Sequence, residues 1–131
     1  MDLVERIRDS LDSIEGLPTK VRIGYMQPDD YLALYPLPGS SVRDEDWSGN
    51  QTKKMNYEVA IRTQDPQLGN DSLWRISDYL ESLKEIKSKN NSFQFEKIEQ
   101  NGLPSITQQD EQGYSVFSLD FFVEVITNNR K

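Results

Sequence analysis

The chain has 131 residues and a formal net charge of −7, with 35% hydrophobic and 28% charged residues. This length suits one domain with a single core, and the acidic balance argues against binding to nucleic acid or to an anionic membrane. The absence of Cys and His excludes disulfides, serine triads, cysteine proteases and the common zinc sites. Because no apolar stretch has membrane-spanning length, we expect the protein in a cytoplasm.

The first part of the chain is predicted to form a helix and two strands. Apolar residues recur at helical spacing over residues 2–15, and Gly16 ends that pattern. A half-buried strand is expected at 20–26, where apolar and polar residues alternate, and a turn follows at 27–30. A second strand is expected at 31–36.

The next segment, residues 39–54, has no helical or strand periodicity, and we expect a long flexible loop there. The clearest central strand follows at 54–64, because its side chains alternate cleanly between apolar and polar. Its two faces are Met55, Tyr57, Val59 and Ile61 on one side and Asn56, Glu58, Ala60 and Arg62 on the other.

A second helix is predicted over residues 71–88, with Asp71 or Ser72 as its N-cap. Trp74 is expected to broaden its apolar stripe. Further strands are predicted at 93–100, 104–108 and 114–127, separated by turns at 101–104 and 108–113. This order of elements predicts an α+β fold, a mostly antiparallel β-sheet with two main helices packed on one face. No internal repeat is evident.

The last predicted strand has one apolar face and one mixed face. The apolar face consists of Phe117, Leu119, Phe121, Val123 and Val125. The mixed face carries Val116 and Phe122 among polar residues. A sheet covered on one side usually presents a polar face to water. The mixed face is therefore expected either to meet another subunit or to leave a few apolar side chains in solvent.

The acidic run in the 39–54 segment suggests a metal site, but only weakly. Asp44, Asp46 and Gly49 match the opening of an EF-hand calcium loop. The twelfth position of such a loop is a bidentate Glu, whereas Met55, a poor calcium ligand, occupies it here. No glycine-rich phosphate cradle accompanies the run either. A solvated acidic face is the simpler interpretation, and the basic residues that balance it are Arg43, Lys53 and Lys54.

Trp47 is a large indole inside this polar segment. One interpretation is that it folds back and holds the segment against the domain surface. The other is an interaction arm, since Trp is enriched at binding hot spots. A segment of Gly, Ser and Asn around a single anchor also suits ordering on binding. We favour the arm.

Two stretches resemble a known family. KKMNYEVAIRTQDPQLGNDSLWRISDYLESL at 53–83 resembles the tail terminator, or minor capsid, proteins of siphophages and of prophages in Gram-positive bacteria. GYSVFSLDFFVEVIT at 113–127 is similar to their final strand, and the resemblance covers residues 1–127. It implies a non-enzymatic α+β subunit without a cofactor. It also implies a hexameric ring that caps the tail tube at its final length and then meets the head connector.

The partners implied by this resemblance are other copies of the chain, the tail tube protein and the head–tail connector protein. The implied location is the tail or neck of the virion, after assembly in the host cytoplasm. The candidate interface residues, chosen on physical grounds, are Arg43, Asp44, Asp46, Trp47, Lys53, Lys54, Val116 and Phe122. The main alternative is a head-completion or connector adaptor protein. A metal-binding enzyme and a host protein-interaction module are less favoured.

Overall fold

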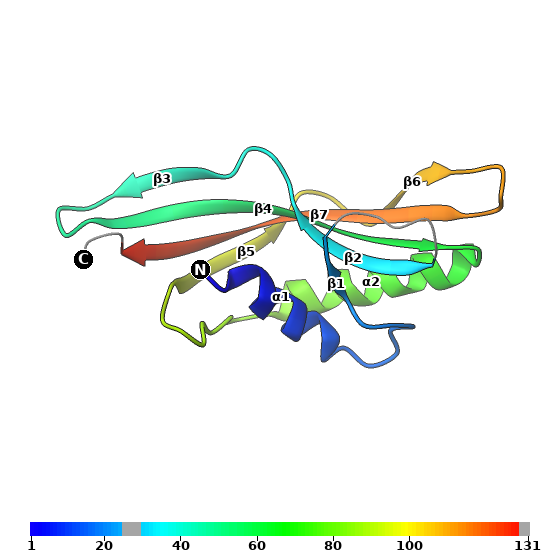
Figure 1. The fold of residues 1–131 in the computed structure, drawn as a ribbon, viewed down its shortest axis with the longest axis horizontal. Helices are drawn as coiled ribbons and strands as arrows, with labels where there is room; N and C mark the ends of the chain where they lie inside the picture. Colours follow the sequence, from blue (N-terminus) through cyan, green and yellow to red (C-terminus); the bar gives the residue numbers. More distant parts are fainter. Residues whose placement is uncertain (25–29, 129–131) are drawn as a thin grey trace.

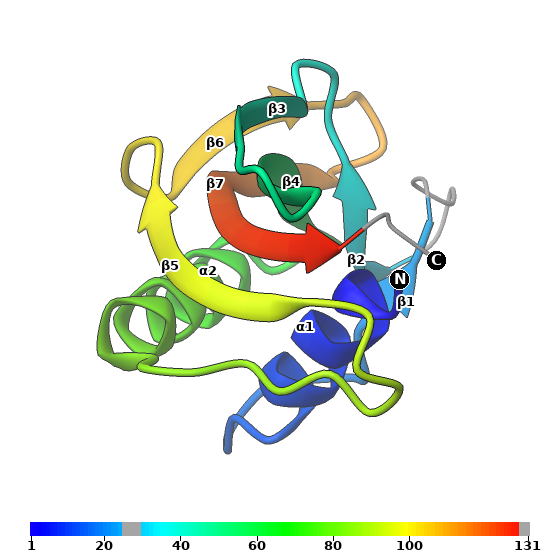
Figure 2. The same cartoon turned by 90° about the vertical axis from the view of Figure 1, so that its left-hand side faces the viewer.

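The computed structural model of the chain describes residues 1–24 and 30–128. Within them lie two helices and a sheet of seven strands, which confirms the α+β prediction. The elements are α1 (Leu3–Asp12), β1 (Arg22–Ile23), β2 (Tyr31–Pro36), β3 (Ser41–Glu45), β4 (Asn50–Thr63), α2 (Pro66–Ser82), β5 (Gln94–Gln100), β6 (Ser105–Gln109) and β7 (Ser115–Asn128). Both helices lie on one side of the sheet, whereas β3 and β6 lie towards the other (Figure 1, Figure 2).

The centre of the sheet is the antiparallel pair of β4 and β7. Each strand has 14 residues, and they pair along their whole length. Two shorter strands in line cover each outer edge. β2 and then β3 pair with β4, whereas β5 and then β6 pair with β7. β1 adds a short parallel pairing beside β2.

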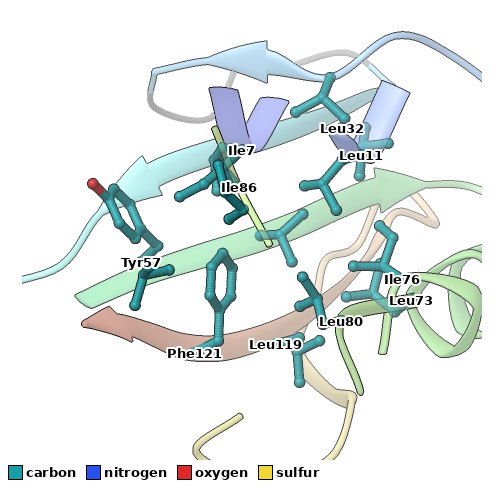
Figure 3. Packing of buried hydrophobic residues seen from close by; sticks show 14 of the residues in the cluster. Ile7, Leu11, Leu32, Tyr57, Leu73, Ile76, Leu80, Ile86, Leu119 and Phe121 are labelled. Carbon is teal, nitrogen blue, oxygen red and sulfur yellow. The ribbon is translucent and has the colours of Figure 1, made fainter. Parts of the chain in front are cut away.

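The main core lies between the sheet and the two helices (Figure 3). α1 contributes Leu3, Ile7 and Leu11, which lie one turn apart and are almost fully buried. The apolar faces predicted for β4 and β7 also belong to this core, and Phe121 is completely buried in it. Burying each such Leu, Ile or Phe side chain contributes about 1.5–3 kcal/mol. This contact therefore holds the helices on the sheet.

Residues 31–63 and 95–127 have the same organisation, so the expectation of no internal repeat is wrong. Each half has a strand, a short interruption with Pro and Gly, a bulged five-residue strand, a turn that begins with Asp, and a 14-residue strand. The bulges in β3 and β6 fall at the equivalent positions Arg43 and Thr107. β5 has a further bulge between Phe95 and Lys97 that β2 lacks, but the shared order of elements and the matching bulges of β3 and β6 indicate an internal repeat.

The helices belong to the repeat as well. RIRDSLDSI at 6–14 matches RISDYLESL at 75–83 at the positions of their buried side chains. Tyr57 and Phe121 are equivalent in the two halves and pair with each other across β4 and β7, with ring centroids 5.8 Å apart. An approximate two-fold axis therefore passes between these two residues.

The loop expected at 39–54 is instead a β-hairpin of β3 and the first half of β4. Every side chain of β3 is exposed, so the segment lacks the apolar alternation from which a strand is predicted. The turn expected at 101–104 does not reverse the chain either. β5 and β6 run in the same direction along β7, and this segment only interrupts them.

The strand expected at 20–26 is reduced to β1 among the described residues, and Ile23 in it is exposed. Val21, just before it, is buried as expected. Tyr25 and most of the turn expected at 27–30 lie outside the described residues. A short edge strand with one parallel neighbour gains few hydrogen bonds, which explains why alternation overestimated its length.

α2 begins at Pro66 and ends at Ser82, so the boundaries predicted at 71–88 are wrong at both ends. The carboxylate of Asp65 caps the helix by accepting a hydrogen bond from the N–H of Leu68 at 3.2 Å. Pro66 suits the first helical position because its fixed φ is helical and it has no N–H to satisfy. Asp65 and Pro66, which suggest an interruption of secondary structure in the sequence, therefore mark the start of α2.

Two residues of α2 differ from the sequence interpretation. Gly69 lies inside the helix, where a Cβ would come within 2.6 Å of the Phe117 ring and 3.0 Å of Thr63. Glycine here allows the helix to approach the sheet closely. Trp74 does not extend the apolar stripe, since its side chain faces outward and is 38% exposed.

We expect Gly69→Ala to destabilise the protein, although Ala favours a helix by about 1 kcal/mol over Gly. The added methyl overpacks the contact with Phe117, which costs about 1–3 kcal/mol. Urea unfolding measures the change. Asn70→Ala, at the next and exposed position of α2, is the matched control and should be neutral or slightly stabilising. A stabilising Gly69→Ala would contradict the close-approach explanation.

Candidate interaction site

Trp47 lies in the turn between β3 and β4, and its side chain is fully exposed, with 103% relative accessibility. It does not fold back onto the sheet, so the interpretation that it holds the segment in place is wrong. Asp46 shapes this turn by accepting hydrogen bonds from the backbone N–H groups of Asn50 and Ser48 at 3.0 and 2.9 Å. These bonds keep the pKa of Asp46 below its ordinary value.

The repeat supplies a second turn of the same kind between β6 and β7. There, Asp110 accepts hydrogen bonds from the N–H groups of Gln112 and Tyr114, both at 3.0 Å. Gly49 and Gly113 occupy the same position with φ of 81° and 88°. Glu111 stands where the first turn has Trp47. The turn therefore forms without Trp, and its geometry does not explain the indole.

The two hairpins differ in how they are anchored. At the β6–β7 hairpin, Arg62 makes an ion pair of 2.7 Å with Asp110 and lies 3.7 Å from the centre of the Tyr114 ring. At the β3–β4 hairpin, Ile126 takes the place of Arg62, and Asp46 makes no ion pair with any described residue. Both hairpins pair into the sheet through β4 and β7, but only the β6–β7 hairpin has this side-chain clamp, and the other carries an exposed indole.

Most of the candidate interface residues lie in this unclamped hairpin, residues 41–54, which we call the arm. They are Arg43, Asp44, Asp46, Trp47, Lys53 and Lys54. The first four are exposed, and the two lysines are half-buried on β4 beside β3. The structure therefore brings these residues together on one projecting element.

The other two candidates, Val116 and Phe122, are buried within the chain at 5% and 8% exposure. The ammonium groups of Lys54 and Lys97 cover Phe122 at 4.4 and 5.7 Å from its ring centre. Val116 packs into a small second cluster with Tyr31. The expectation that this mixed face leaves apolar side chains exposed is wrong, because neighbouring side chains of the curved sheet cover them.

A carboxyl pair on the sheet face opposite the helices was missed. Glu58 and Asp120 lie directly opposite each other in β4 and β7 and share a hydrogen bond. The Tyr35 hydroxyl donates a second hydrogen bond to Glu58. Burial, and then the neighbouring Asp120 carboxyl, raise the pKa of Glu58 to about 7. Alternation predicts the shared face, but only the strand register brings the two carboxyls together.

The geometry of these residues suits protein contact better than chemistry. Among the described residues, no group of three or more acidic, His or Cys side chains could hold a metal ion. The carboxylates of Asp44 and Asp46, which match the EF-hand opening, accept hydrogen bonds from nearby backbone N–H groups. The arm presents an apolar ring and charges of both signs to solvent.

A family model described as bacteriophage tail terminator protein matches residues 9–125, nearly the whole chain. The chain belongs to the bacteriophage tail terminator family. This confirms the resemblance, and it makes the tail terminator a structural protein of the phage tail and a component of the virion. The comparison with curated proteins finds no match. Over residues 1–24 and 30–128, the tail terminator has no helix that is long and apolar enough to cross a membrane.

The carboxyl pair predicts how the stability of the tail terminator depends on pH. Because the pKa of Glu58 rises from 4.5 to about 7 on folding, the folded protein holds this proton more tightly than the unfolded chain. The contribution of Glu58 to the free energy of unfolding is fully present below pH 4.5 and is lost as the pH rises through about 7.

We expect Glu58→Gln, which resembles the protonated carboxyl, to raise the melting temperature at pH 8 and to change it little at pH 4.5. Thermal unfolding followed by circular dichroism between these pH values measures the effect. Glu81→Gln, on the exposed side of α2, is the control. Equal pH dependence in Glu58→Gln and the parent protein would contradict the raised pKa of Glu58 beside Asp120.

Proposed function

We propose that the tail terminator assembles into a ring that caps the tail tube at its final length and then forms the junction to the head connector. The observation that carries this proposal is the arm, which lacks the clamp of its counterpart and ends in a fully exposed Trp47. Such an indole is typical of a binding anchor. A closed ring needs head-to-tail contacts between two different patches of each subunit, and the arm supplies one patch.

The proposed role is structural and needs neither catalysis nor a cofactor. Its partners are other copies of the chain, the tail tube protein and the head–tail connector protein. Assembly takes place in the host cytoplasm, and the ring then becomes part of the neck. The family match supports a tail terminator over a head-completion adaptor. Within the arm, the proposed contact residues are Arg43, Asp44, Asp46, Trp47, Lys53 and Lys54.

We expect Trp47→Ala to leave the free energy of unfolding within about 0.5 kcal/mol of the parent protein, because a fully exposed side chain has few contacts to lose. The same variant should fail to stop tube growth. The assay adds the protein to polymerising tail tube protein and measures tube lengths by electron microscopy. Glu111→Ala changes the equivalent position of the clamped hairpin and should stop growth normally.

Two results would contradict this assignment. A large drop in melting temperature with normal termination would make Trp47 a structural residue. Normal termination by a stable Trp47→Ala variant would mean that the arm tip takes no part in the contact. Failure of the parent protein to stop tube growth or to bind tube ends would reject the proposed function itself.

A further inference from the structure

A hollow of about 250 Å³ lies at the end of the folded subunit that is opposite the arm. Apolar walls come from Pro18, Ile61, Leu68 and the ring of Tyr31, and polar groups from Thr19, Asp30, Arg62 and Thr63. Figure 1 shows the end of β4 and the start of α2 at one end of the long axis and the β3–β4 turn at the other. The arm of a chain therefore cannot reach its own hollow.

One residue of the lining, Tyr31, carries an unsatisfied hydroxyl that is buried beside the hollow. Among the described residues this hydroxyl has no hydrogen-bond partner, and Tyr31 as a whole is only 2% exposed. Burial raises the pKa of Tyr31 to about 12, so the hydroxyl is neutral at physiological pH. Buried polar groups in native proteins are rarely left without a partner. An indole N–H, which can only donate, suits the free lone pairs of this oxygen, but it reaches the oxygen only if the Tyr31 side chain turns toward the hollow.

The charges around the hollow are opposite to those beside Trp47. Asp44 and Glu45 are exposed at the arm tip and follow Arg43. Lys20 and Arg22 are exposed just after the part of the hollow formed by residues 18–19. Within the lining, Asp30 offsets Arg62, which is also paired with Asp110, so the basic character of the rim comes from Lys20 and Arg22. An acidic tip thus faces a mainly basic rim when two chains meet end to end.

We propose that the indole of Trp47 from one subunit enters this hollow on a second copy of the chain. There the ring packs beside Pro18 and Leu68, its N–H reaches the Tyr31 hydroxyl when that side chain turns toward the hollow, and the tip carboxylates face Lys20 and Arg22. The contact joins two different ends of the subunit, so it is heterologous and closes into a ring when the rotation between neighbours allows. It rests on the proposed ring and names the surfaces that meet within it.

A second hollow, of about 460 Å³, lies between α2 and β5 and is a competing binding site for the indole. Leu80, Ile98 and Leu103 give it apolar walls, but Glu81 and Glu99 also line it. These carboxylates would face the acidic arm tip, and like charges across an interface oppose binding. This hollow therefore serves as the control in the test.

The experiment follows the fluorescence of Trp47 in a Trp74→Phe background, where it is the only Trp. The readouts are emission wavelength and quenching by acrylamide at low and high protein concentration, and with tail tube protein added. We expect a blue shift and weaker quenching as the protein assembles. Leu68→Glu, in the proposed hollow, should abolish both changes, whereas Leu103→Glu should retain them. These leucines are 36% and 65% exposed, and melting curves check that both variants fold.

A charge swap tests the orientation independently. Asp44→Arg and Arg22→Glu should each weaken self-association by up to about fivefold, the scale of an exposed ion pair. The double variant carries both changes in every subunit, so each contact regains opposite charges and association should recover. Recovery in the double variant is not expected if the two residues act on separate surfaces.

Other outcomes overturn the inference while leaving the proposed function in place. Assembly with unchanged Trp47 fluorescence would mean that the indole is not at the contact between subunits. Shielding lost in Leu103→Glu but kept in Leu68→Glu would place the indole in the second hollow. Shielding that requires tail tube protein and is insensitive to Leu68→Glu would place it on the tube. By contrast, a protein that neither assembles nor binds tube ends would reject the proposed function together with this contact.

Discussion

The antiparallel pairing of β4 with β7 is the contact on which the rest of the fold depends. It is centred on Tyr57 and Phe121, which are equivalent residues of two similar halves. Each of these long strands has its own interrupted edge strands and its own hairpin. Because the pair is antiparallel, the two hairpins project from opposite ends of the sheet (Figure 1). An elongated subunit with unlike ends follows directly from this pairing.

The differences between the two halves carry the functional information. Positions that are alike, such as Asp46 and Asp110, maintain the turns. Positions that differ decide what each hairpin does. Arg62 clamps the second hairpin, but Ile126 cannot clamp the first, and the first turn has Trp47 where the second has Glu111. The repeat thus acts as an internal control, which shows that the exposed indole is not a requirement of the fold.

The sequence predicted those elements in which burial alternates. The apolar faces of β4 and β7 and the buried stripe of α1 were all predicted correctly, because each has one face in the core. β3 could not be predicted from its pattern, since all its side chains are exposed. The start of α2 was missed because Pro66 and Gly69 usually mark breaks, whereas here one begins the helix and the other fits against Phe117.

The candidate site was predicted in part, for similar reasons. The composition around Trp47 indicated an anchor in polar surroundings, and in the structure the Trp47 side chain is fully exposed. The carboxyl pair of Glu58 and Asp120 depends on strand register, and the unsatisfied Tyr31 hydroxyl depends on packing. Neither leaves a local pattern in the sequence. The repeat did leave one, in RIRDSLDSI and RISDYLESL, and comparison of the chain with itself would have found it.

The most direct test of the ring is the mass of the protein by light scattering after gel filtration, at high and low concentration. If the unlike ends of neighbouring subunits bind each other and the ring closes, the protein should give one species of fixed mass that dissociates to monomer on dilution. A monomer at every concentration, or a ladder of sizes that lengthens with concentration, would contradict a closed ring formed through the arm.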